Sequence, residues 1–328
     1  MPADAAGRAL TAATAALPEY PAHSRSLQRL LDALDRRSSA HERAAIVQSD
    51  AGLAIAALRA GNGQGGDVCG AARAVDVIGE AGLGRVAEAL PTFDSLAPAD
   101  QAAERLRLHA AAVQRAAERV IGVLGSEESD DVLTAALLHD VGKLALAAAE
   151  PEYALAGDLP PAERLQRERL AHGIDHAAVG AALAGGWGLP DRLANTIAEH
   201  HSPRAQGAAA IVRLADMLGH YEQGAPVQVE EVEEAAAAIG LGREAIGALL
   251  YELPYPVRSG RRPQPCPLSL RELTVLRKLG EGKVYKQIAA DEGIAPSTVR
   301  NYLHSAYAKL GVVDRAQAVL MAADHGWI

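Results

Sequence analysis

The residues with the clearest capacity for chemistry are histidines and aspartates in the middle third of the sequence. His139 is followed directly by Asp140, so an imidazole and a carboxylate stand side by side. Both groups are ligands for divalent metals such as Fe, Mn, Zn or Mg. The complete candidate set is His109, His139, Asp140, His176, His200, His201 and Asp216. The sequence therefore predicts a mono- or binuclear metal site built from residues far apart in the chain.

In order, these candidates read H…HD…H…HH…D, a pattern that resembles the HD superfamily of metal-dependent phosphohydrolases. In that family the first His, the HD pair and the last Asp hold one metal. The HD aspartate can bridge to a second, which the intermediate histidines complete. The resemblance implies two ions that clamp a phosphoryl group. Lys143 lies one helical turn after His139, and we expect it to face the same cavity and contact a phosphate. Only in an active enzyme would Asp140 and Lys143 be catalytic.

Further landmarks indicate a narrower relationship, because the chain also resembles HDOD domains, the signalling relatives of these enzymes. The resemblance covers roughly residues 17 to 222 and rests on Ile46–Asp50, Leu53, Leu58–Asn62, Leu138–Lys143, Gly173–His176, Gly180, Trp187–Pro190 and the pair His200-His201. HDOD domains are usually regulatory and often lack ligands, whereas this chain keeps the full set. No Gly-Tyr-Pro follows the histidine pair, and Arg105 stands where a trinuclear site would have an acid. Cyclic di-GMP hydrolysis is therefore not expected.

The stretch from Leu268 to Ile328 is predicted to contain a helix-turn-helix. A short helix that includes Ala289 ends at Gly293, and Pro296 begins the next one. A small residue at the crossing lets two helices approach at a steep angle. The stretch resembles the LuxR-type helix-turn-helix in Arg271–Leu273, Gly282, Ile288-Ala289, Thr298-Val299, Lys309–Val312, Arg315 and Ala318. The resemblance implies that this unit binds double-stranded DNA.

By that resemblance, the helix from Pro296 to about Lys309 enters the major groove. The side chains expected to face bases are those of Ser297, Arg300, Asn301 and His304, while those of Lys286, Thr298 and Lys309 hold phosphates. Val299 and Leu303 are expected to face the core. Since a single unit of this size makes few base contacts, we expect a homodimer.

Composition and charge agree with a helical protein that has a localised DNA-binding end. Aromatic residues make up 3% of the 328 residues and alanine is abundant, which favours packed helices over sheets. The net charge is −9, yet the last 61 residues carry eight Lys/Arg against six Asp/Glu. Cys69 and Cys266 have no CxxC partners and are expected to be reduced thiols. We find no run of about 18 apolar residues and no signal peptide, so a cytoplasmic protein without membrane contact is expected.

The predicted architecture is all-α, with an HDOD/HD-like body followed by a small four-helix LuxR-type unit. The expected boundaries are residues 1–98 for an N-terminal helical lobe, 99–256 for the lobe with the metal site, 257–267 for a Pro/Arg-rich linker and 268–328 for the helix-turn-helix. Residues 1 to about 22 are weakly patterned, and Asp50 is expected to cap a helix that begins at Ala51. The helix that opens at Glu127–Asp131 is expected to carry His139 and Asp140. Tyr153 and Trp187 are interpreted as core or rim residues, and Glu150 and Glu168 as solvated.

These features predict a DNA-binding transcription regulator whose body senses a metal-held ligand, phosphorylated or nucleotide-like. Two alternatives stay open. The first is an active metal-dependent phosphodiesterase with a DNA-binding output domain. The second is a dimerisation scaffold without a ligand.

Overall fold

The computed structural model describes most of the chain, and its helices account for nearly all regular structure. The described residues are 2–63, 66–95, 100–125, 129–150, 153, 161–225, 227–252, 267–280, 283–310, 312, 315, 318, 319 and 322. Two compact units are present, Met1–Tyr255 and Pro256–Ile328. The all-α prediction is confirmed. Most of the predicted linker, together with Gly282 and Cys266, lies outside the described residues.

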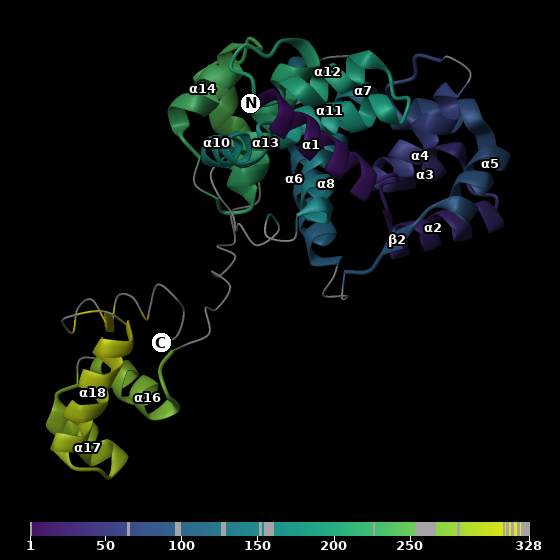
Figure 1. The fold of residues 1–328 in the computed structure, drawn as a ribbon. Helices are drawn as coiled ribbons and strands as arrows, with labels where there is room; N and C mark the ends of the chain where they lie inside the picture. Colours follow the sequence, from purple (N-terminus) through teal and green to yellow (C-terminus); the bar gives the residue numbers. More distant parts are fainter. Residues whose placement is uncertain are drawn as a thin grey trace. The chain divides into compact units, whose positions relative to one another are not determined.

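Among the residues described up to position 95, five helices and two very short strands form the first part of the larger unit. They are α1 (Pro2–Ala16), β1 (Ala22–His23), α2 (Ser24–Asp35), α3 (Ala40–Gln48), α4 (Ala51–Asn62), α5 (Ala71–Ala89) and β2 (Thr92–Phe93). The strands pair in parallel, with Ala22 opposite Thr92. Neither these strands nor the regular helix α1 at the N-terminus was predicted from the sequence. In Figure 1, α1 leaves the lobe of α2 to α5, and it packs against α8 and α11.

Asp50 explains how the chain turns from α3 into α4. Its Oδ1 accepts a hydrogen bond from the Leu53 N–H at 3.1 Å, which caps α4, and its Oδ2 accepts from the His23 N–H at 2.9 Å. Such a cap satisfies an N–H group that the first helical turn leaves unpaired. The predicted capping role of Asp50 is confirmed, and the same carboxylate also ties β1 to α4.

In the part of the chain that the structure describes, nine helices form the rest of the larger unit. They are α6 (Gln101–Leu124), α7 (Ser129–Leu138), α8 (Val141–Ala149), α10 (Pro161–His172), α11 (His176–Gly186), α12 (Asp191–Glu199), α13 (Gly207–Glu222), α14 (Val229–Ala237) and α15 (Arg243–Glu252). Buried Leu, Val, Ile and Ala side chains from both parts of the unit form one continuous core. His139 and Asp140 lie in a turn between α7 and α8 rather than inside one helix, which corrects the prediction.

The segment Ser129–Ala149 also corrects the expectation that no run is long and apolar enough to cross a membrane. Among the described residues it passes that test by length and composition. However, 72% of its most apolar window is buried inside the fold. Two core helices in succession, α7 and α8, account for this composition.

The smaller unit has its own core. Its described helices are α16 (Leu270–Gly280), α17 (Tyr285–Glu292) and α18 (Pro296–Leu310). Val299 and Leu303 are buried on the inner face of α18, as predicted. Gly293 ends α17 with φ of 64°, a left-handed conformation that glycine adopts without steric cost. The fourth predicted helix falls largely outside the described residues.

Candidate metal centre

Four helices and the turn between α7 and α8 bring the predicted ligands together in the larger unit. His109 lies on α6, the HD pair between α7 and α8, His176 at the start of α11, the His200-His201 pair at the end of α12, and Asp216 on α13. The His139, His176 and His200 side chains are fully buried, and the Asp140 and Asp216 side chains are 4% and 3% exposed. Burying so many polar groups is costly unless they have partners or ligands.

The close approach of α8 and α11 depends on Gly142. A Cβ at this position would lie 2.0 Å from the His176 carbonyl oxygen and 2.6 Å from the Gly180 nitrogen. Because both are backbone atoms, no side-chain rotation can make room for it. Gly142 therefore allows the turn at Asp140 to reach His176, whose Nε2 lies 3.2 Å from Asp140 Oδ1.

Hydrogen bonds at the outer ring nitrogen orient four of the histidines. Nδ1 of His139 donates to the Ala136 carbonyl at 2.8 Å, and Nδ1 of His200 donates to the Ile197 carbonyl at 2.7 Å. Nδ1 of His176 donates to Glu168 Oε2 at 2.7 Å. Nδ1 of His109 lies 3.0 Å from Gln223 Oε1. Since an oxygen acceptor holds the proton on Nδ1, each Nε2 is available to bind a metal, as is usual for ligating histidines.

Several of the inward-facing atoms are left without a hydrogen bond. Among the described residues, the buried atoms in this state include His139 Nε2, His200 Nε2 and Asp140 Oδ1. Asp140, His176, His200 and His201 each offer a donor atom within 4.8 Å of the others, and so do His109, His139 and Asp140. Ligands bound at about 2.1 Å from one ion stand about 3–4 Å apart. The donor set and its spacing therefore fit a divalent metal.

The charges in the centre strongly shift the pKa values of its histidines and aspartates. Burial disfavours protonation of His139, but the Asp140 and Asp216 carboxylates outweigh it and raise the pKa of His139 to about 10. Burial together with the charge of His139 lowers the pKa of His200 to about 3. The pKa of Asp140 falls well below its usual range because His139 and Lys143 outweigh its burial. A divalent cation would compete with the His139 proton, since only a deprotonated nitrogen coordinates.

Lys143 lies at the centre, on the first turn of α8. Its Nζ forms an ion pair with Asp140 Oδ2 at 2.5 Å, and its side chain is 12% exposed. The predicted position next to the HD pair is therefore found, while contact with a phosphate stays a prediction. A phosphate could draw the ammonium group away from Asp140, because both offer oxygen acceptors to the same cation.

Glu168 was predicted to be solvated, and this prediction is wrong. The Glu168 side chain is buried, and it accepts hydrogen bonds from the backbone N–H and Nδ1 of His176 and from Tyr153 Oη. Its pKa is lowered, because these donors, His176 above all, outweigh the burial that would raise it. Periodicity did not predict this burial because most residues of α10 are polar. In its described residues α10 buries Glu168, through contacts with His176 and Tyr153 that the periodicity of the sequence does not encode.

Two further polar residues at the centre were not singled out from the sequence. His220 lies one turn after Asp216 on α13, with Nε2 3.4 Å from Asp216 Oδ1. Gln223 follows at the end of the same helix and contacts His109. The spacing of Asp216 and His220, four residues apart on one helix, places both side chains on one face and was a signal that could have found His220.

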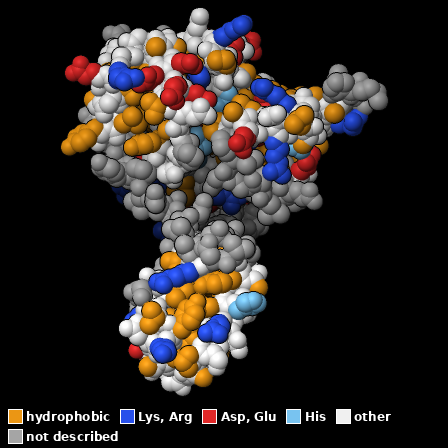
Figure 2. All heavy atoms as spheres, turned by 90° about the vertical axis from the view of Figure 1, so that its left-hand side faces the viewer, with side chains coloured by type: hydrophobic (Ala, Val, Ile, Leu, Met, Phe, Trp, Pro, Cys, Tyr) orange, Lys and Arg blue, Asp and Glu red, His pale blue; other side chains and the backbone are white. Residues whose placement is uncertain are grey.

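The predicted DNA-reading residues share one face of α18. Ser297, Arg300, Asn301 and His304 are exposed and fall at i, i+3, i+4 and i+7, opposite the buried Val299 and Leu303. Lys286 is exposed on α17 and Thr298 is half-buried. Lys309 instead pairs with Glu272 at 2.7 Å, although its side chain stays 43% exposed. Figure 2 shows more basic than acidic side chains on the visible face of this unit.

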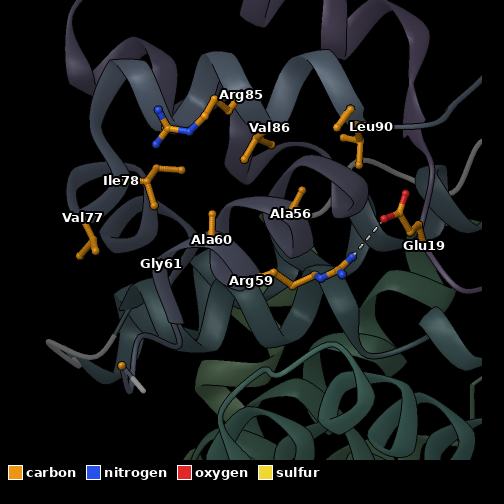
Figure 3. A pocket seen from close by; sticks show the side chains of 13 residues that line it. Glu19, Ala56, Arg59, Ala60, Gly61, Val77, Ile78, Arg85, Val86 and Leu90 are labelled. Atoms are coloured by element: carbon orange, nitrogen blue, oxygen red, sulfur yellow. Dashed lines mark ion pairs between the residues drawn. The ribbon is translucent and has the colours of Figure 1, made fainter. Parts of the chain in front are cut away.

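A separate pocket of about 770 Å³ lies away from the histidines, between α4 and α5 (Figure 3). Ala56, Ala60 and Ile78 contribute to its apolar lining, and Arg59 forms an ion pair with Glu19 at its edge. None of the predicted metal ligands lines it. This pocket and the predicted metal centre therefore lie in different places in the larger unit.

Comparisons with known proteins find a family for each of the two units. The family model for the HDOD domain matches residues 17–203, and that for bacterial regulatory proteins of the luxR family matches residues 266–322. The probable transcriptional regulatory protein NarL of Mycobacterium tuberculosis is 33% identical over 157 residues, which span 46% of this chain and 67% of that protein. The spore germination protein GerE of Bacillus subtilis is 43% identical over 53 residues, 16% of this chain and 72% of that protein.

Two solved structures share the fold. The MmoQ response regulator from Methylococcus capsulatus str. Bath superposes with a TM-score of 0.59 at 23% identity, covering 72% of this chain and 99% of that one. A virulence factor from Campylobacter jejuni gives 0.58 at 15% identity, covering 76% and 95%. At such identities the likeness concerns the fold alone.

Proposed function

Because the chain belongs to the HDOD family and carries a LuxR-type regulatory domain in its smaller unit, we propose that its HDOD body senses a metal-held ligand and so controls DNA binding. The chain is a LuxR-type transcriptional regulator with an HDOD domain. The proposal adds the input: a divalent metal at the histidine centre, and a phosphorylated or nucleotide-like ligand bound to it. Assembly as a homodimer is part of the same proposal.

One observation carries this proposal. Four histidines that are 9% exposed or less have Nδ1 held by an oxygen acceptor, and their Nε2 atoms converge on two aspartates. In a purely structural core this arrangement of side chains would be unfavourable, because two buried nitrogens and one buried oxygen have no hydrogen bonds. A metal ion would satisfy these atoms together. A bound ion would also attract phosphate oxygens and offset their charge.

Residues of the chain supply the other groups that the proposed function needs. Asp140 lies between the two halves of the centre, 3.2 Å from His176 Nε2 and 3.6 Å from His109 Nε2, and can therefore contribute to both. Lys143 supplies a cation beside it that can bind a ligand phosphate. On α18, Arg300 and Asn301 present hydrogen-bonding groups suited to base edges, and Lys286 presents a charge suited to a phosphate.

The experiment measures metal content, ligand binding and DNA binding on the full chain. We expect the purified protein to contain a divalent metal, and Asp140→Ala to remove it while the helical circular dichroism is kept. A panel of mono- and cyclic nucleotides is then tested by calorimetry with and without metal. A matched control is His41→Ala, which changes an exposed histidine on α3. Absence of metal from the unaltered protein, with DNA binding unchanged in Asp140→Ala, would contradict the proposal and favour a scaffold.

A second function, metal-dependent phosphodiesterase activity, is favoured by one observation: the ligand set is complete and Lys143 lies beside it. The same nucleotides distinguish the two. Turnover that disappears in Asp140→Ala would support catalysis, whereas a nucleotide that binds and is recovered intact would support sensing.

A further inference from the structure

We propose that His220 is an additional ligand of the metal centre and completes a nitrogen-rich ion site with His109 and Asp216. The inference rests on the proposed metal-binding function and deepens it. The HD pattern read from the sequence does not include His220, and its last member is Asp216. The three residues lie on α6 and α13, which pack against each other along the core.

The distances place His220 within reach of the same ion as its neighbours. His109, Asp216 and His220 each offer a donor atom within 4.8 Å of the other two. Asp216 Oδ1 lies 3.0 Å from His109 Nε2 and 3.4 Å from His220 Nε2. These separations match those between ligands that share one ion.

The two imidazoles also lie beside each other. The ring centroids of His109 and His220 are 4.4 Å apart, with the planes inclined by 36°. His139 Nε2 lies 3.6 Å from Asp216 Oδ1 and is close enough to take part. The group therefore offers up to three imidazoles and one carboxylate. Imidazole-rich sets favour Zn or Fe over Mg, which prefers oxygen ligands.

A second group of donors lies on the other side of Asp140. Asp140, His176, His200 and His201 form a set of four that contains neither His109 nor His220. The centre therefore has enough donors for two ions. The His220 side chain is 20% exposed, whereas His201, the most exposed histidine of the other group, is 12% exposed, so the ion beside His220 is the one closer to the surface. We infer that this ion exchanges faster.

An ordinary helical ion pair is the competing explanation, because Asp and His four residues apart on one helix commonly attract each other. The two explanations predict different results when a carboxylate replaces the imidazole at position 220. A negative side chain beside Asp216 is repelled if no ion is present and is a good ligand if one is. His220→Glu therefore separates them.

The test is metal stoichiometry of the full chain by mass spectrometry after loading with Zn²⁺ or Mn²⁺ and desalting, with affinities from chelator competition. We expect two ions in the unaltered protein. His220→Ala and the similarly sized His220→Gln should weaken one of them at least about tenfold, and His220→Glu should restore it. His41→Ala is the control and should bind as the unaltered protein does.

The outcomes are separable. Two ions of unchanged affinity in both His220→Ala and His220→Gln would overturn the inference and leave the proposed function intact. An unaltered protein that binds neither ion would overturn both. Loss of one ion in His220→Ala without recovery in folded His220→Glu would make His220 an electrostatic partner of Asp216 rather than a ligand.

Discussion

At the scale of single residues, the histidines of the centre owe their orientation to partners behind them. His176 is the best example, because Glu168 Oε2 accepts hydrogen bonds from both its backbone N–H and its Nδ1, at 2.8 and 2.7 Å. Tyr153 Oη donates to the other oxygen at 2.7 Å. A carboxylate in this place fixes the ring and makes Nε2 a stronger ligand.

Glu168→Gln tests that role. The amide can keep one hydrogen bond to His176 but removes the negative charge, so we expect metal affinity to fall about 10- to 100-fold while the fold is retained. Chelator competition measures the change. Glu163→Gln is the control, because Glu163 is exposed on the same helix. Equal affinities for the two variants would contradict the role of Glu168.

At the scale of elements, the contact between α8 and α11 sets the geometry of the centre. Gly142→Ala would force a Cβ to within 2.0 Å of the His176 carbonyl oxygen. We expect a loss of about 3 kcal/mol or more in the free energy of unfolding, together with lower metal content, because the backbone has to move. Gly185→Ala on α11 is the control, since a Cβ there has nothing within 4 Å. Denaturant unfolding that gives the same stability for both variants would show that the helices have room to adjust.

Glu272 joins the helices of the smaller unit and should make its stability depend on pH. Burial would raise its pKa, but hydrogen bonds from Lys309, Ser305 and Ser269 lower the pKa to about 2. A lowered pKa stabilises the fold above the ordinary value of 4.5, and this contribution disappears as the pH falls from about 4.5 to about 2. We expect Glu272→Gln to be less stable at pH 7 and to approach the unaltered protein near pH 2. Parallel melting curves of the two proteins across that interval would contradict this.

The exposed face of α18 makes a prediction about DNA. Arg300 is exposed on that face, whereas Val299 beside it is buried. Arg300→Ala should weaken specific DNA binding by about 1–3 kcal/mol. Lys286→Ala should weaken binding to all sequences alike and reduce its salt dependence. Gel shifts at several salt concentrations separate the two effects, and an unaltered gel shift for Arg300→Ala would exclude it as a base-reading residue.

At the scale of the whole molecule, the charge of the chain is unevenly distributed. The last 61 residues carry a balance of +2 from eight basic and six acidic residues, while the whole chain carries −9. A positive unit on an acidic chain confines DNA binding to one end of the sequence. Regulation then requires that ligand binding in the larger unit changes DNA binding by the smaller unit.

Thermodynamic linkage makes this requirement measurable. If Mn²⁺ loading changes DNA affinity by some factor, DNA must change Mn²⁺ affinity by the same factor, typically about 5- to 150-fold. Fluorescence anisotropy on labelled DNA and chelator competition give the two values. Asp140→Ala should lose the coupling, so that adding Mn²⁺ no longer changes its DNA affinity. Equal DNA affinities with and without Mn²⁺ would show that metal alone does not couple the two units.

The sequence by itself determined the helical class, the helix-turn-helix with its inner and outer faces, and the seven candidate ligands. These depend on local signals: residue type, periodicity and the order of motifs along one chain. The cap at Asp50 and the buried positions Val299 and Leu303 followed from the same signals.

Only the tertiary structure decided which side chains share the centre and what holds them. The HD pair lies in a turn, Glu168 is buried behind His176, and His220 joins His109, because these relations depend on how helices far apart in sequence pack. Gly142 shows the physical reason: its contact with His176 spans 34 positions and involves backbone atoms, which no local pattern encodes. The sequence could therefore not show which side chains lie within ligand distance of one another, because the packing of helices that are distant in sequence sets these distances.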